Sequence, residues 1–193
     1  MTSRDQMLSR TRQNKPDLLP LPEVPTFVDE KDDLMDRFQK ALAFVGGTLL
    51  EVAEGTSLSD QIRQTFPEAE RIASSLELTG IDLVPIDTRT DKNVLEQVDL
   101  AVLAGEFAVA ENAAVWLPEA NMLNRSLPFI TQHLVLVVAK DQLVANMHVA
   151  YQRIDRASLS YGVFIAGPSK TADIEQSLVV GAHGARSLLV VLI

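Results

Sequence analysis

Apolar positions recur at helical spacing in the first half of the chain. Apolar side chains three or four residues apart predict a helix over residues 34–45, which the Gly46-Gly47 pair ends. The same spacing predicts a second helix over residues 56–66, and Pro67 ends it. Two more helices are expected, a brief one from a cap at Asn93 to Val98 and a longer one over residues 144–156.

Short apolar runs between these helices predict strands. They cover residues 48–52, 71–74, 83–86, 100–103, 114–117, 133–139, 161–166 and 188–193. The runs at 100–103, 133–139, 164–166 and 188–193 lack the alternation of a half-exposed strand, so we expect them to be buried central strands. Strands that alternate with helices predict an α/β fold with a mostly parallel sheet covered on both faces.

The first 33 residues have a different composition from the rest. They are polar and contain four prolines, Pro16, Pro20, Pro22 and Pro25, which prevent a continuous helix and favour an extended conformation. We therefore expect a flexible N-terminal arm over residues 1–33 and one folded domain over residues 34–193. The arm either wraps a partner or is a plain leader.

The polar turn Gly167-Pro168-Ser169-Lys170-Thr171 is the first candidate site. It follows the strand predicted at 161–166 and precedes a helix predicted over 173–180, with Thr171 as its N-cap, Asp173 in its first turn and Gly181 at its C-terminal cap. Free backbone N–H groups, the hydroxyls of Ser169 and Thr171 and the Lys170 ammonium would then bind a phosphate or carboxylate. Capping of the helix alone accounts for the same residues.

Three other side chains are weaker candidates. His183 lies in the turn after the last predicted helix, where it either orients a ligand and transfers protons or bonds a nearby carbonyl. Glu111 shares with Glu106 the loop region expected after the 100–103 strand, and it acts either as an acid/base group or as a solvated surface carboxylate. Arg125 pairs with a ligand anion or with a surface carboxylate.

Composition excludes several classes of function. The chain has no cysteine, which excludes disulfides and Cys-ligated iron–sulfur or zinc sites within it. His133 and His148 have no second histidine four residues further on, so no metal site is expected. A net charge of −9 disfavours binding to nucleic acid or anionic membranes. No apolar run is long enough for a membrane span or a secretory signal, so we expect a cytoplasmic protein.

The C-terminal segment also carries a family resemblance. The string GPSKTADIEQ, followed by Gly181, His183-Gly184 and a terminal apolar run, is similar to the C-terminal signature of the LutC-type lactate-utilization protein C family, which has a LUD domain. Val98-Asp99, EFAVAE at 106–111 and RSLP at 125–128 follow the order of that family, and the resemblance covers residues 31–193.

One loop departs from the family pattern. Where members commonly read Ala-Glu-Thr-Gly-Thr, this chain has Ala110-Glu111-Asn112-Ala113-Ala114. The carboxylate is kept, but a glycine and two hydroxyls are lost. If that loop binds a ligand in relatives, its contacts are altered here.

The resemblance implies a three-layer Rossmann-like fold similar to that of sugar-phosphate isomerases and coenzyme A transferases. It further implies an accessory, non-redox subunit of a bacterial system that oxidises L-lactate to pyruvate, with iron–sulfur and cysteine-rich partner proteins that hold the redox centres. Two alternatives stay open: a stand-alone enzyme acting on a sugar phosphate or an acyl-coenzyme A through Glu111 or His183, and a plain interaction module. The residues leave open whether the chain is a homo-oligomer.

Overall fold

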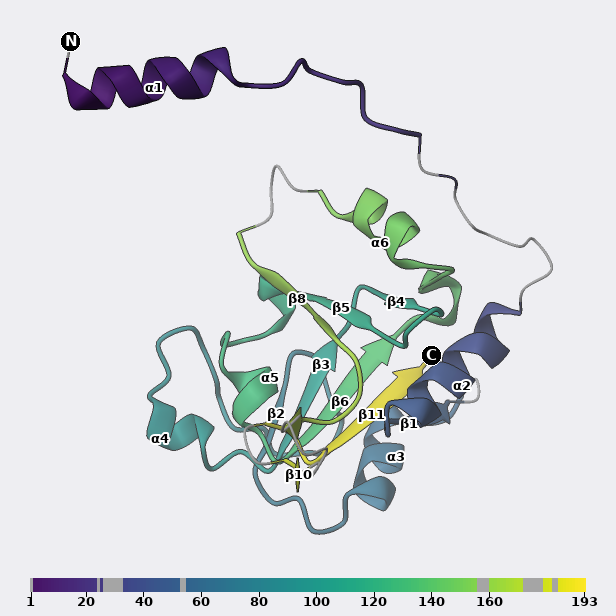
Figure 1. Ribbon diagram of the computed structural model, residues 1–193. Coiled ribbons are helices and arrows are strands. Elements are labelled where there is room, and N and C mark those ends of the chain that lie inside the picture. Colours follow the sequence, from purple (N-terminus) through teal and green to yellow (C-terminus); the bar gives the residue numbers. More distant parts are fainter. Residues whose placement is uncertain are drawn as a thin grey trace.

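A computed structural model describes residues 2–23, 25, 33–52, 55–155, 160–171, 179–181 and 184–193 (Figure 1). The helices are α1 (Ser3–Gln13), α2 (Leu34–Phe44), α3 (Leu58–Thr65), α4 (Lys92–Leu95), α5 (Leu127–Ile130) and α6 (Met147–Arg153), with 3-10 turns η1 (Glu119–Asn121) and η2 (Lys140–Gln142). The strands are β1 (Thr48–Glu51), β2 (Ile72–Ser74), β3 (Leu100–Ala104), β4 (Phe107–Val109), β5 (Val115–Pro118), β6 (His133–Val138), β7 (Leu143–Val144), β8 (Gly162–Ile165), β9 (Lys170–Thr171), β10 (Val179–Val180) and β11 (Ser187–Leu192).

A five-stranded parallel sheet forms the centre of the fold, in the order β1-β11-β6-β3-β2. Its middle strands β3, β6 and β11 are almost entirely buried, as their continuous apolar runs predict. The strand expected over residues 83–86 is wrong, because only Leu83 pairs there, in a single bridge to Ile72. The predicted mostly parallel sheet is otherwise confirmed.

Both faces of the central sheet are covered. On one face Phe38 and Leu42 of α2 pack into a cluster with side chains such as Leu136 and Val190. On the other face Ile62 of α3 packs with alternate side chains of the same strands, among them Val135. Successive strand residues point to opposite faces, so the continuous apolar runs supply both clusters.

A second, four-stranded sheet was not predicted from the sequence. It has the order β7-β4-β5-β8, with β5 antiparallel to both of its neighbours (Figure 1). Val115 and Leu117 belong to the cluster on the α2 face of the central sheet, whereas Trp116 packs with Phe107 and Phe164 in an outer cluster under α6. The second sheet is therefore a layer between the central sheet and α6.

Two expectations about this region are wrong. Residues 107–109, which the sequence pattern places in a loop, form β4. A three-residue strand is too short to show periodicity, so the pattern does not predict it. Residues 164–166 were expected in a buried central strand, but β8 is partly exposed and lies at the edge of the second sheet, and Ala166 is exposed.

Helix boundaries differ where polar side chains decide them. The helix expected over 144–156 begins later, since Leu143–Val144 pair with β4 and the side chain of Asn146 caps α6. The cap expected at Asn93 is Asp91, whose carboxylate accepts the Asn93 backbone N–H at 2.8 Å.

The N-terminal segment contains a helix that the sequence analysis did not predict. Thr2 and Asp5 form a reciprocal capping box at the start of α1, and the helix ends before Pro16, so the prolines do not interrupt it. None of its residues is buried. Across the described ranges, no helix is both long and apolar enough to cross a membrane.

Candidate functional site

The turn at residues 167–169 connects β8 to β9 and packs against the end of α2. Gly167 has a φ of +75°, and a Cβ atom there would lie 2.6 Å from the Val45 carbonyl oxygen. Both the left-handed backbone and this close approach require glycine. The sequence therefore holds the turn tightly against the last turn of α2.

A cavity of about 290 Å³, here called the turn cavity, opens beside this turn. Its lining residues are Pro128, Phe129, Leu134, Phe164, Ile165, Ala166, Gly167, Ser169, Lys170, Gly184 and Ala185. Ser169 is held by its backbone, whose N–H donates to Ala185 O at 2.8 Å. Gly184 leaves the space beside it, since a Cβ there would lie 2.9 Å from the Ser169 Cβ. Lys170 is the charged residue among the described residues of this lining, which is therefore electropositive.

The Lys170 ammonium has a structural partner as well as access to the cavity. A Cβ built on Gly46, directly after α2, would lie 3.5 Å from Lys170 Nζ. The ammonium thus lies at the negative end of the α2 dipole, a position that stabilises a cation. This packing holds the charge at the cavity without a carboxylate beside it among the lining residues.

The local structure after the turn differs from the expectation. Lys170–Thr171 form β9 and pair antiparallel with Val179–Val180, so Thr171 is in a strand and the predicted helix does not reach Val180. Residues 172–178, which include Asp173, and residues 182–183, which include His183, lie outside the described residues.

The turn follows the carboxyl end of β8, but the turn cavity lies at the N-terminal edge of the central sheet. Leu134 and Ala185 line it at the starts of β6 and β11, which places it at the N-terminal edge of the parallel strands. Sequence order suggested the carboxyl edge, because a strand precedes the turn. That strand is β8, which belongs to the second sheet.

Glu111 has a structural role in this fold. Its Oε2 accepts the Met147 backbone N–H at 2.9 Å, so it satisfies a free donor in the first turn of α6. Glu106 lies at the other end of β4, and the two carboxylates do not converge. The pairing of Val115 with Ile165 brings the 110–114 loop to the same end of the second sheet as the 166–169 turn. Both segments of the family signature are therefore neighbours.

The 110–114 loop, which departs from the family pattern, has an unusual backbone conformation at Ala113. Ala113, which stands at the glycine position of the family pattern that the sequence resembles, has a φ of 57°. This is the left-handed region that glycine adopts without steric cost. The Ala114 N–H donates to the Asn112 side chain at 3.1 Å, a local bond that holds the loop.

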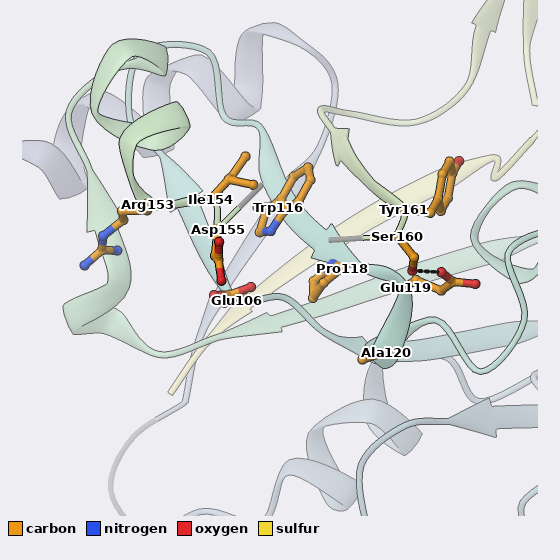
Figure 2. A pocket seen from close by; sticks show the side chains of 10 residues that line it. All are labelled: Glu106, Trp116, Pro118, Glu119, Ala120, Arg153, Ile154, Asp155, Ser160 and Tyr161. Atoms are coloured by element: carbon orange, nitrogen blue, oxygen red, sulfur yellow. Dashed lines mark hydrogen bonds between the residues drawn. The ribbon is translucent and has the colours of Figure 1, made fainter. Parts of the chain in front are cut away.

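A second cavity, here called the acidic cavity, lies beyond the carboxyl end of β3 and has a volume of about 260 Å³ (Figure 2). Its lining residues are Glu106, Trp116, Pro118, Glu119, Ala120, Arg153, Ile154, Asp155, Ser160 and Tyr161. Figure 2 shows Glu106 and Asp155 toward one end of the view and Glu119 with Ser160 toward the other. The lining contains three carboxylates and one guanidinium, so this cavity has the opposite charge to the turn cavity.

Arg125 belongs to the acidic cavity's surroundings and not to the turn. Its guanidinium donates to both Glu119 oxygens, at 2.6 and 2.9 Å, and lies 5.1 Å from the centre of the Tyr161 ring. The hydrogen bonds from Arg125 and then Ser160 lower the pKa of Glu119 below its ordinary value. Arg125 is near the Gly162 end of β8, whereas the turn follows the Ile165 end.

Sequence analysis missed most of the acidic cavity. Glu119, Arg153 and Tyr161 come from segments that no common spacing connects. Pairing of β5 with β8 brings Glu119 close to Tyr161, and Arg153 of α6 lies over the Phe107 ring of β4. Glu106 was noticed, because it follows a buried strand directly. For metal ions, the described ranges contain no group of three or more His, Cys, Asp or Glu side chains suited to hold one.

Comparisons with known proteins place the chain in a family. The sequence model of the LUD domain matches residues 5–193. The lactate utilization protein C of Shouchella clausii (strain KSM-K16) is 34% identical over 106 residues, which cover 51% of this chain and 46% of that protein. The lactate utilization protein C of Anoxybacillus flavithermus is 27% identical over 161 residues, covering 82% of this chain and 70% of that protein.

A solved structure has the same fold. The crystal structure of a DUF162 family protein from Deinococcus radiodurans superposes with a TM-score of 0.67 at 18% sequence identity, over 83% of this chain and 96% of that one. The match to the Shouchella protein spans less than half of that protein's length. Because the LUD model matches residues 5–193, this chain belongs to the LUD domain family.

Proposed function

We propose that this chain is an accessory component of bacterial lactate utilization and binds a small carboxylate in the turn cavity. The name of its relatives, lactate utilization protein C, supports the process. The electropositive turn cavity, with Lys170 as its charged lining residue, supports the ligand class. This observation carries the proposal.

Charge separates the two cavities as candidates. A carboxylate in the acidic cavity would meet the like charges of Glu106 and Asp155, while Glu119 is already paired with Arg125. A like charge at 4 Å costs about 4 kcal/mol at an effective dielectric constant of 20. In the turn cavity the same carboxylate meets an ammonium and a hydroxyl. The small anion therefore belongs at the turn.

The chemistry of the lining favours binding over turnover. Lys170 and the Ser169 hydroxyl would donate to the carboxylate, while Phe129 and Phe164 provide an apolar wall. The described lining contains neither a histidine nor a carboxylate to act as acid or base. We therefore assign a binding role to this chain and the oxidation of lactate to partner proteins.

The partners proposed are iron–sulfur and cysteine-rich proteins. Oxidation of L-lactate to pyruvate releases two electrons, and a chain without cysteine offers no thiolate ligands for an iron–sulfur cluster. Coexpression followed by affinity pull-down should recover an iron–sulfur protein with this chain. The purified chain alone should be colourless, and stoichiometric iron in it would contradict the assignment.

Calorimetric titration with lactate, pyruvate, a sugar phosphate and coenzyme A tests the ligand. We expect lactate or pyruvate to bind, and Lys170→Ala to weaken that binding about tenfold, because one charge-assisted hydrogen bond is lost. Lys140→Ala is the matched control. Lys140 Nζ lies 3.3 Å from Glu51 Oε2, and Lys140 does not line the turn cavity. Equal losses in both variants, or binding of the sugar phosphate or coenzyme A alone, would overturn the proposal.

A further inference from the structure

A third cavity lies at the N-terminal edge of the central sheet, on the α3 face. It has a volume of about 400 Å³ and is here called the histidine cavity. Its lining residues are Thr65, Phe66, Pro67, Glu68, Ala69, Asp99, Gln132, His133, Arg186 and Ser187. The neighbouring residues Leu134 and Ala185 line the turn cavity, so both cavities lie at the starts of β6 and β11.

His133 and Ser187 form a fixed polar pair inside this cavity. They are register partners on β6 and β11, and His133 Nδ1 lies 2.7 Å from Ser187 Oγ in a hydrogen bond. The Phe66 ring packs against the imidazole, with 5.4 Å between ring centres. Because Nδ1 is engaged, Nε2 is the nitrogen left for a ligand, and among the described residues none bonds it.

Arg186 supplies the positive charge of the cavity. Its Cγ packs against Gly181, where a side chain would collide with it, so the stem of the arginine is held in place. In the described part of the chain no carboxylate forms an ion pair with its guanidinium. The Asp99 carboxylate is already engaged, because its Oδ2 accepts the backbone N–H groups of Glu70 and Arg71 at 3.0 and 2.8 Å.

The rest of the lining is suited to an apolar group. Phe66, Pro67 and Ala69 line the cavity, and the Phe66 ring packs against the His133 ring. A guanidinium presents paired donors that match a carboxylate, and an imidazole and a hydroxyl can complete its hydrogen bonds. Arg186, His133 and Ser187 therefore suit the carboxylate of a ligand with an apolar body, although Glu68 and Asp99 also line the cavity.

We propose that the histidine cavity binds a carboxylate attached to an apolar or aromatic body, with Arg186, His133 and Ser187 on the carboxylate and Phe66 against the body. This site is separate from the turn cavity and lies on the other face of the sheet. It is a second binding site of this chain, and it does not depend on the proposed role of Lys170.

Benzoate is the probe, titrated into the full chain and followed by NMR. We expect saturable binding, a loss of about tenfold or more in affinity in Arg186→Gln, and little binding of benzyl alcohol, which lacks the charge. Arg186 is exposed, so the variant should fold, and Arg89→Gln, at another exposed arginine, is the matched control. Equal affinity of Arg186→Gln and the unaltered chain would overturn the proposal, as would inorganic phosphate competing as strongly as benzoate.

The titration of His133 provides an independent readout. Burial and then the Arg186 charge lower the pKa of His133, and Asp99 raises it, while Glu68 is the other charged group of the lining. A bound carboxylate favours the imidazolium, so benzoate should raise the pKa of His133. An equal pKa of His133 with and without benzoate would contradict the proposed site. Lys170→Ala should leave benzoate binding intact, which separates this test from that of the proposed function.

Discussion

The turn cavity and the acidic cavity lie at opposite edges of the central sheet and have opposite charge. The turn cavity, at the starts of β6 and β11, contains Lys170 and no carboxylate in its described lining. The acidic cavity, beyond the end of β3, contains three carboxylates and one arginine. Two edges of one scaffold therefore carry cavities whose described linings have opposite charge.

The comparison shows why motif order alone misplaces a site. A strand followed by a polar turn suggests the carboxyl edge of a parallel sheet. Here the preceding strand, β8, belongs to the second sheet, and that sheet returns the chain to the N-terminal edge. The edge of the central sheet at which a cavity lies therefore follows from the strand topology and not from the order of motifs in the sequence.

The largest effect is expected from a charge in the sheet that both cavities share. Val137 on β6 is 3% exposed, so Val137→Asp would bury an unpaired carboxylate. We expect a loss of about 3–5 kcal/mol in the free energy of unfolding, measured by urea denaturation, and damage to both cavities. Leu18→Asp, at a side chain that is 91% exposed, is the control. An unchanged free energy of unfolding in the Val137→Asp variant would show that Val137 is not in the core.

An intermediate effect separates backbone strain from packing at the turn. Gly167 and Gly55 both have positive φ, at +75° and +82°, but only Gly167 has backbone within reach of a Cβ. Gly55→Ala should cost about 1–2 kcal/mol from strain alone, and Gly167→Ala should cost more because of the Val45 carbonyl. Thermal denaturation measures both, and the Gly167 variant should also lose carboxylate binding. Equal costs would mean that the turn does not depend on its contact with α2.

The smallest effect concerns the ion pair at the acidic cavity. Arg125 and Ser160 lower the folded pKa of Glu119, so their stabilisation is present above the unfolded pKa and is lost as the pH falls through the folded value. Arg125→Gln should raise the pKa of Glu119 toward its ordinary value, as measured by NMR. Its small stability deficit should be present at about pH 7 and should disappear as the pH falls through the lowered folded pKa of Glu119. A deficit that persists in acid would assign the effect of Arg125 to its packing on Tyr161.

Much of the fold could be predicted from the sequence, and the second sheet could not. Long periodic or continuous apolar segments, such as α2 and β6, were identified because each is long enough to show its pattern. Strands of two or three residues, such as β4 and β9, form by pairing with neighbouring strands and are too short to show a hydrophobic periodicity in the sequence. The sequence places Ser169 and Lys170 in one polar turn, and their role as a ligand site stays a prediction. The ion pair of Arg125 with Glu119 depends on a contact that the sequence pattern does not show.

The most direct test of the account is a crystal structure of the full chain soaked in oxamate, a carboxylate of lactate's size. The account predicts oxamate in the turn cavity, with its carboxylate in hydrogen-bond contact with Lys170 Nζ and the Ser169 hydroxyl, and none of it beside Glu106. Oxamate in the acidic cavity, or an empty turn cavity at a concentration that saturates the protein in solution, would contradict it.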